Sequence, residues 1–273
     1  MIVVLNDWIG YDLFREREVG FYKIKCGLGE ICQRMEKYRA GKDFEVHIVI
    51  NIGSVFDIHK PDWSARKSKF KEFVLRRSKS GFFRVRAQKK RYAELQEKFS
   101  FIKSISYRGN ICMDIGAYDF AYQRLKSAGY NGDVVFMNTT LSGPHADNWL
   151  LDYQRLFYSR ENIGFAGVSL NSHNTLKSEQ TFMPHVQSFF LYTSMQVLNQ
   201  AFPQQLIVPE KVKNRHNLIT QGEVGLSQHL INQGYGLISK AYPDFAYFKE
   251  ADWTIPVGDI RHKEGFAEFA NRI

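Results

Sequence analysis

Apolar residues along the chain follow two spacings, and segments of the two kinds alternate. Short continuous apolar runs predict buried strands, and these lie at 2–5, 44–51, 102–107, 133–137, 164–170 and around Ile238. Three- and four-residue apolar steps predict helices, and these lie at 21–38, 88–99, 115–128, 149–157, 223–233 and, after a strand end, within 186–202. The alternation predicts the α/β class: a single domain over 1–273, with a mostly parallel, Rossmann-like sheet and helices on both faces.

Two polar groups flank the helix and strand within the stretch 107–144. They are Arg108, Asn110 and Asp114 before the helix, and Asn138, Thr139 and Thr140 after the strand. Ligands of α/β sheets bind beyond the carboxyl ends of parallel strands. Both groups should therefore meet at one edge of the sheet and form a binding site there.

The positive charge of the chain is concentrated in one segment. The chain of 273 residues carries a formal net charge of +9, yet 60–91 alone holds 13 Lys or Arg against two acids. That segment also contains several aromatic residues, so it predicts a basic amphipathic insertion at about 60–91 that lies on an anionic membrane surface. A solvated helical insertion is the plainer interpretation. No nucleic-acid motif accompanies the charge, and nucleic acid is not expected as a partner.

The remaining composition points to a cytoplasmic protein. The three cysteines form no CxxC pair, which favours reduced thiols. No apolar run approaches the ~18 residues of a membrane span, and the opening MIVVLNDWIG lacks the basic flank of a signal peptide. We therefore expect a cytoplasmic location, peripheral on the inner face of the cell membrane.

Four segments in order resemble bacterial sugar transferases of the GT-A fold, of the capsule and surface-polysaccharide type. They are RGNICMDIGAY (108–118), DVVFMNTTLSGP (133–144), PHVQSFFLYTSMQVL (184–198) and GEVGLSQHLINQGYGL (222–237). Together they cover about half of the chain. The resemblance implies a glycosyltransferase that moves a hexose or pentose from a nucleotide-sugar donor, with UDP as the first choice. The acceptor would be a growing surface polysaccharide or a lipid-linked oligosaccharide.

The resemblance also assigns roles to residues of this chain. Donor binding falls to Arg108, Asn110, Asp114, Asn138 and Thr140, and acceptor binding to His185 and Gln187. Glu223 becomes the general base of an inverting transfer, at the start of the helix 223–233. A carboxylate at a helix N-terminus is stabilised as the anion, which suits a base but lowers its basicity.

The chain departs from the GT-A pattern at the expected metal site. The D-x-D motif that holds a divalent cation is replaced by Asn138-Thr139-Thr140, and amide and hydroxyl oxygens are weak ligands for Mg²⁺ or Mn²⁺. The metal ligands are therefore unknown. Either a cation binds mainly through the diphosphate, or basic side chains and backbone amides take over its charge.

Each assignment has a structural alternative. Asp114 could cap a helix, Arg108 could form a surface ion pair, and Asn138 with Thr140 could form a turn before Gly143-Pro144. Glu223 could be an ordinary first-turn acid, and His185 a buried structural histidine.

Two other functions stay open. The segment CMDIGA (112–117) is similar to the loop of an S-adenosylmethionine-dependent methyltransferase, although later glycines are missing. A non-catalytic module that binds a polyanion or a membrane through 60–91 is the second alternative.

Overall fold

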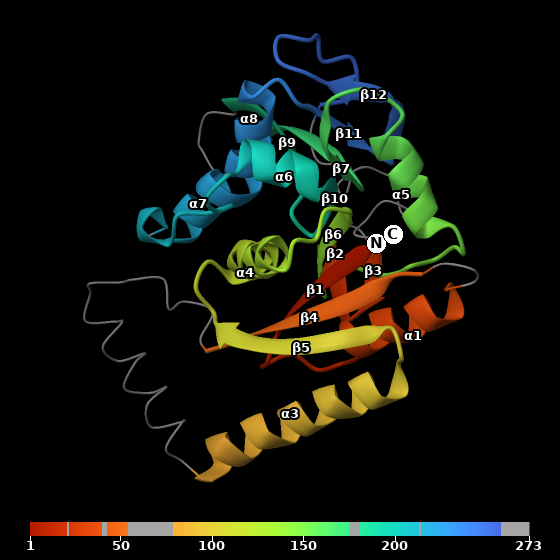
Figure 1. The fold of residues 1–273 in the computed structure, drawn as a ribbon, viewed down its shortest axis with the longest axis vertical. Coiled ribbons are helices and arrows are strands. Elements are labelled where there is room, and N and C mark those ends of the chain that lie inside the picture. Colours follow the sequence, from red (N-terminus) through yellow and green to blue (C-terminus); the bar gives the residue numbers. More distant parts are fainter. Residues whose placement is uncertain (21, 40–42, 54–78, 175–180, 213, 258–272) are drawn as a thin grey trace.

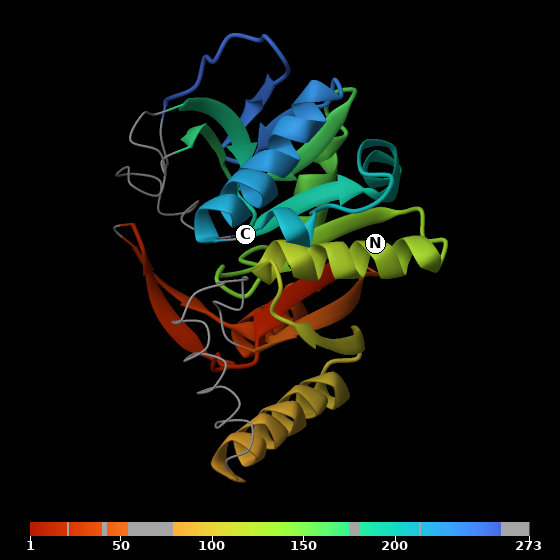
Figure 2. The same ribbon diagram turned by 90° about the vertical axis from the view of Figure 1, so that its left-hand side faces the viewer.

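The computed structural model describes the chain except for residues 21, 40–42, 54–78, 175–180, 213 and 258–272. The strands of its central sheet are β1 (Ile2–Trp8), β4 (Glu45–Ile52), β5 (Ile102–Gly109), β6 (Asp133–Asn138), β7 (Ile163–Gly167), β10 (Phe190–Ser194), β11 (Gly236–Ser239) and β12 (Tyr242–Tyr247). Two ribbons stand apart from the sheet, β2 (Arg15–Val19) with β3 (Tyr22–Cys26) and β8 (Leu170–Asn174) with β9 (Thr181–Val186). Figure 2 shows both ribbons on the same side of the molecule.

The helices follow the strands in alternation along most of the chain. They are α1 (Leu28–Lys37), α3 (Lys79–Lys98), α4 (Met113–Ser127), α5 (Trp149–Phe157), α6 (Met195–Ala201), α7 (Arg215–Leu218) and α8 (Val224–Asn232), with a 3₁₀ turn η1 (Pro209–Lys211) and a π-helical turn η2 (Ile219–Glu223). This alternation confirms the predicted α/β fold class.

Four neighbouring strands of the sheet run parallel, and they bring their carboxyl ends to one edge. The sheet order is β12-β11-β7-β10-β6-β1-β4-β5 (Figure 1). Strand β1 pairs in parallel with β4 and β6, and β4 pairs in parallel with β5. Strand β11 is also parallel to β7, whereas β10 and β12 are antiparallel to their neighbours. The sheet is thus mostly parallel, as predicted.

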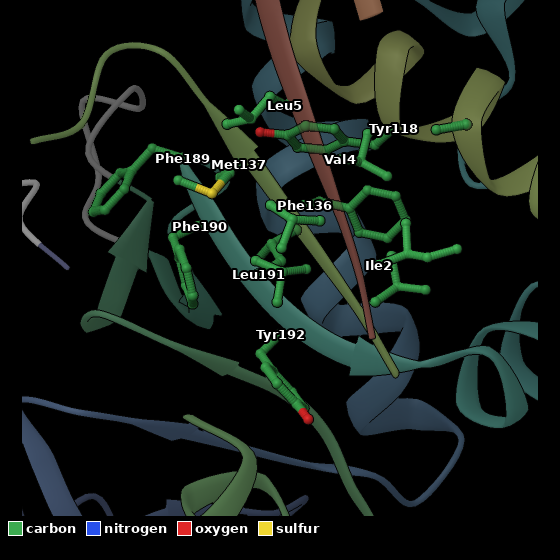
Figure 3. Close-up of a cluster of buried hydrophobic side chains, with 14 of the residues drawn as sticks. Ile2, Val4, Leu5, Tyr118, Phe136, Met137, Phe189, Phe190, Leu191 and Tyr192 are labelled. Carbon is green, nitrogen blue, oxygen red and sulfur yellow. The ribbon is translucent and has the colours of Figure 1, made fainter. Parts of the chain in front are cut away.

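Helices cover both faces of the sheet, because its strands are apolar on both sides. In β10, Phe190 and Tyr192 pack on rings of α5. Leu191 points the other way and pairs with Phe136, whose ring lies 5.1 Å from that of Tyr118 in α4. Figure 3 shows this double-sided packing around β1, β6 and β10. Helices α4 and α5 therefore lie on opposite faces, and the core fills both layers.

The predicted helix at 21–38 is wrong in its first part. Residues 22–26 form β3, which pairs with β2 as a hairpin, and the helix α1 begins only at Leu28. In YKIKC the two lysines are exposed whereas Ile24 and Cys26 are buried, so the strand period fits this segment as well as a helical one does. Gly27, with φ of +110°, separates the two elements.

Part of the basic segment lies in a described helix. The helix predicted at 88–99 is longer in the structure, since α3 spans Lys79–Lys98. Its buried residues Tyr92 and Leu95 join the core, and charged residues face outward. The rest of the predicted insertion, from 60 to 78, lies outside the described residues.

Candidate functional site

A cleft with about 420 Å³ of space, open to solvent, lies at the carboxyl edge of the parallel strands. It is lined by Asn6, Asp7, Trp8, Tyr11, Asn51, Asn110, Met113, Asp114, Asn138, Thr139 and Thr140. These residues come from the ends of β1, β4, β5 and β6 and from the start of α4. Most of these residues carry amide, hydroxyl or carboxyl groups, and Trp8, Tyr11 and Met113 add apolar surface, which suits a ligand with both polar groups and an apolar face.

The structure brings the two polar groups of the 107–144 stretch together. The Asn138 side-chain amide donates to Asp114 Oδ2 at 3.0 Å. Asn138 Oδ1 in turn accepts from the backbone N–H and the hydroxyl of Thr140, at 3.0 and 2.5 Å. The pKa of the Asp114 carboxyl is raised above its ordinary value. Burial is the main cause and the nearby Glu223 adds to it, while the hydrogen bond from Asn138 acts in the opposite direction. Asp114 lies within the first turn of α4 and not at its cap, which is Cys112.

Arg108 lies behind the cleft and braces its wall. Its guanidinium donates to Asn51 Oδ1 at 2.8 Å and to the Ile111 carbonyl at 2.8 Å. Asn51 donates to the Met113 carbonyl at 3.0 Å, which ties the end of β4 to the start of α4. Arg108 is not among the lining residues, whereas Asn110 is, so these two predicted donor ligands differ in placement.

Asp7, at the end of β1, is a cleft residue that the sequence analysis missed. It is 1% exposed and accepts hydrogen bonds from the hydroxyls of Thr139, at 2.5 Å, and Tyr92, at 3.2 Å. Arg15 Nη1 lies 4.0 Å from Asp7 Oδ1. Burial raises the pKa of the Asp7 carboxyl to about 6, although its hydrogen bonds and Arg15 lower it. Asn6 and Asp7 follow the apolar run 2–5 directly. A polar residue directly after a buried strand is also the signal that pointed to Asn138.

Replacing Asp7 with asparagine is expected to change how stability depends on pH. The folded pKa of about 6 lies above the ordinary 3.8, so protonated Asp7 stabilises the fold, and this contribution is lost as pH rises from about 4 to 6. The variant has no such titration. Its stability relative to wild type should therefore rise by roughly 2–2.5 kcal/mol between pH 4 and pH 7, measured by urea unfolding at each pH.

The exposed Asp147 provides a matched control for this experiment. Asp147→Asn should track wild type across the same pH range. A difference between Asp7→Asn and wild type that stays constant with pH would contradict the raised pKa of Asp7.

A second polar cluster adjoins Asp114. Both the backbone N–H and the hydroxyl of Ser188 donate to Glu223 Oε2, at 3.0 and 2.6 Å. The same hydroxyl lies 3.4 Å from Asp114 Oδ2. His185 Nε2 lies 3.9 Å from Glu223 Oε1. The candidate base is thus joined to the cleft through Ser188, another residue that sequence reasoning did not select.

Glu223 does not stand at a helix start, contrary to the prediction. The helix α8 begins at Val224, but α7 and the π-helical turn 219–223 run directly into it. Glu223 is therefore preceded by helical turns and gains no stabilisation from free N–H groups of a helix end. Its carboxylate accepts two hydrogen bonds from Ser188 instead.

The two predicted acceptor ligands are buried. His185 is 4% exposed, and its Nδ1 lies 2.8 Å from the Met183 carbonyl. Gln187 is 2% exposed and accepts from the Ser169 hydroxyl at 3.0 Å. Neither lines the cleft, so their part in acceptor binding stays a prediction.

The donor set of the cleft does not resemble a carboxylate cation site. Within the described part of the chain, no group of three or more His, Cys, Asp or Glu is placed to hold a metal ion. Both carboxylates of the cleft, Asp7 and Asp114, already accept side-chain hydrogen bonds, and the Asn138 oxygen accepts two from Thr140. The side chains of the cleft therefore do not fit a cation held by the protein.

Comparison with known proteins gives one family match. A sequence model of the family described as RgpF, rhamnan synthesis protein F, matches residues 86–240, which is more than half of the chain. No curated protein matches the chain. Among solved structures, a cytidylyltransferase from Leptospira borgpetersenii serovar Hardjo-bovis (strain JB197) has 11% sequence identity and a TM-score of 0.38, with 98% of this chain and 84% of that chain covered.

Proposed function

Because the chain belongs to the RgpF family, rhamnan synthesis protein F, we propose that it is a glycosyltransferase of polysaccharide biosynthesis. The donor is a nucleotide sugar, and the acceptor is a growing surface polysaccharide or a lipid-linked oligosaccharide. The observation that carries this proposal is the polar cleft at the carboxyl edge of the sheet, with the Glu223 carboxylate beside it. A nucleotide-binding cleft and a carboxylate base are the two parts that sugar transfer requires.

The chemistry of the cleft supports a nucleoside diphosphate at one end. The rings of Trp8 and Tyr11 lie 5.1 Å apart at the end of β1, and aromatic side chains stack on nucleobases. Asn51 and Asn110 lie on the same wall and suit the ribose, and Asn138 with Thr140 suits the donor sugar or diphosphate. We take UDP as the nucleotide. Binding assays should be run with and without Mg²⁺ or Mn²⁺, so that any effect of a bound cation is measured.

Glu223 is the proposed general base of an inverting transfer. Its carboxylate removes the proton of an acceptor hydroxyl, whose oxygen then bonds to the anomeric carbon of the donor sugar. The bond from that carbon to the diphosphate breaks, and the nucleotide leaves with the electron pair. The Glu223 side chain is 27% exposed, so an acceptor can reach it.

Ligand-induced stabilisation tests the proposed donor. At UDP about 100-fold above its Kd, we expect the Tm to rise by roughly 5 °C, because only a ligand of the folded state stabilises it. S-adenosylmethionine and a single-stranded oligonucleotide should leave the Tm unchanged. Each ligand, UDP included, is measured once with EDTA and once with Mn²⁺. Asn138→Ala should reduce the UDP effect, whereas Asn148→Ala, an exposed asparagine without a cap hydrogen bond, should not.

Other outcomes of this panel select another function. A rise with S-adenosylmethionine alone would favour a methyltransferase. A rise with the oligonucleotide alone would favour a polyanion-binding module. Either result would overturn sugar transfer.

We also propose that the basic segment at 60–91 holds the protein on the anionic inner face of the cell membrane. Among the described residues, no helix is long and apolar enough to cross a membrane. In α3, Arg86, Lys90 and Arg91 are exposed on its outer surface. Basic side chains near an anionic lipid surface each contribute about 1 kcal/mol to binding. A lipid-linked acceptor would then be within reach of the cleft.

Neutralising three charges of α3 tests the membrane proposal. The triple variant Arg86→Gln, Lys90→Gln, Arg91→Gln should bind vesicles containing anionic lipid about 100-fold more weakly, from about 1 kcal/mol per charge. Sedimentation with vesicles at low and high salt measures this.

A second triple variant, with exposed lysines elsewhere changed, is the control. It replaces Lys23, Lys25 and Lys37 with glutamine, residues that are all exposed outside the basic segment. Its vesicle binding should stay close to that of wild type. Equal losses in both variants would mean that net charge, and not this segment, drives binding.

A further inference from the structure

The two oxygens of the Glu223 carboxylate have different surroundings. Oε2 accepts both hydrogen bonds from Ser188, at 3.0 and 2.6 Å. Among the described residues Oε1 has no such donor, and it lies 3.9 Å from Nε2 of His185. Ser188 therefore fixes the carboxylate so that Oε1 is the oxygen left for proton transfer. The Glu223 side chain is 27% exposed, whereas that of His185 is 5% exposed.

The hydrogen bond of His185 determines its tautomer. Nδ1 lies 2.8 Å from the backbone carbonyl of Met183, which can only accept. The proton of a neutral ring must therefore be on Nδ1, and the lone pair is on Nε2, toward Glu223 Oε1. A lone pair and a carboxylate anion do not attract each other. The contact becomes favourable once a proton lies between them.

Other ionisable groups also face this pair. The Asp114 carboxylate lies 3.4 Å from the Ser188 hydroxyl, and the Tyr118 hydroxyl donates to the Ser188 carbonyl at 2.9 Å. Burial raises the pKa of Tyr118 well above its ordinary value, so it stays neutral. Asp114 places a second carboxylate beside Glu223, which makes retention of an extra proton in this cluster more favourable.

We propose that His185 is the residue that takes over the proton which Glu223 removes from the acceptor, and that Ser188 is the positioning residue that aligns the two. This rests on the proposed function. The acceptor O–H bond breaks and its proton bonds to Glu223 Oε1. Glu223 Oε1 and His185 Nε2, 3.9 Å apart, then approach to hydrogen-bond distance while Oε2 keeps its hydrogen bonds from Ser188, and the proton passes to His185 Nε2. The result is an imidazolium and a regenerated carboxylate. The imidazolium loses this proton to water when the product leaves.

The pH dependence of transfer tests this assignment. An imidazole that is already protonated cannot accept a proton, so wild-type transfer should fall as the pH is lowered. His185→Gln should lower kcat at pH 8 by about tenfold or more, with donor Kd unchanged. The ratio of wild type to variant should shrink toward pH 5. A ratio that is constant with pH, or no loss in kcat, would overturn the proposal.

A matched control and a second readout separate this proposal from sugar transfer itself. His229→Gln changes a histidine of α8, whose Nε2 lies 2.7 Å from the Ala201 carbonyl, and should leave the profile unchanged. Nitrogen-15 NMR of labelled histidine at pH 8, assigned by the His185→Gln spectrum, should show Nδ1 protonated and Nε2 free. Protonation on Nε2 overturns the proposal whether or not transfer is detected. Wild type with the expected tautomer but no transfer from any nucleotide sugar overturns the proposed function.

Discussion

Glu223→Gln is expected to lower kcat for sugar transfer by about 10²- to 10⁴-fold, the usual contribution of a general base. Glutamine keeps the shape of the side chain, and its carbonyl oxygen can still accept from the Ser188 N–H and hydroxyl. It cannot take a proton from the acceptor. The affinity for UDP should therefore stay within about twofold of wild type. Steady-state transfer assays with a UDP-sugar panel, together with UDP titration calorimetry, measure both quantities.

Glu97→Gln provides the matched control, since Glu97 is exposed on α3 and does not line the cleft. It should retain wild-type transfer and UDP affinity. Full activity in Glu223→Gln would remove Glu223 from the mechanism, and Asp114 would then be the carboxylate to change next. A folding defect is excluded if the UDP affinity is preserved.

Gly116→Ala is expected to destabilise the protein by about 2–3 kcal/mol. A Cβ at this position would lie 2.1 Å from the Ile111 carbonyl oxygen and 2.8 Å from Arg108 Nη2. The first of these atoms is backbone and cannot move aside without shifting the start of α4. The gain in helix propensity, about 1 kcal/mol for alanine over glycine, is smaller than this clash. UDP binding should weaken as well, because the same turn holds Asn110 and Asp114.

Gly109→Ala is the matched control, because a Cβ there would meet nothing within 4 Å. Urea unfolding should place Gly109→Ala close to wild type and Gly116→Ala well below it. Equal stabilities of the two variants would show that the turn after β5 adapts freely. The role of Arg108 as a brace of this turn would then lose its support.

The meeting of Asp114 and Asn138 follows from rules that act along the chain. Two polar groups at the ends of successive parallel strands must reach the same edge of a sheet, and their spacing predicts this without coordinates. The same rule applied to Asn6 and Asp7 would have found the end of β1. The apolar run 2–5 on its own predicts only the strand.

Other outcomes depended on contacts between distant segments. Residues 22–26 fit both a helical stripe and a strand, and pairing with β2 decides for the strand. The predicted helix 223–233 begins at Glu223, yet in the structure the turns before it continue the helix. Gly222 is buried, and a Cβ there would lie 2.9 Å from the Ile115 side chain. Its small size therefore serves the packing of this helix on α4.

By itself the sequence determined the α/β class, the parallel core and the edge of the sheet at which polar side chains gather. Those properties follow from the period of apolar residues and from short-range rules on strand ends. The tertiary structure alone decided which groups touch there: Asp7 with Thr139, Arg108 with Asn51, and Glu223 with Ser188 and His185. The physical reason is that each of these pairs joins residues at least 35 positions apart in the chain. Hydrogen bonds between such residues are set by how helices and strands pack, and no local pattern in the chain records them.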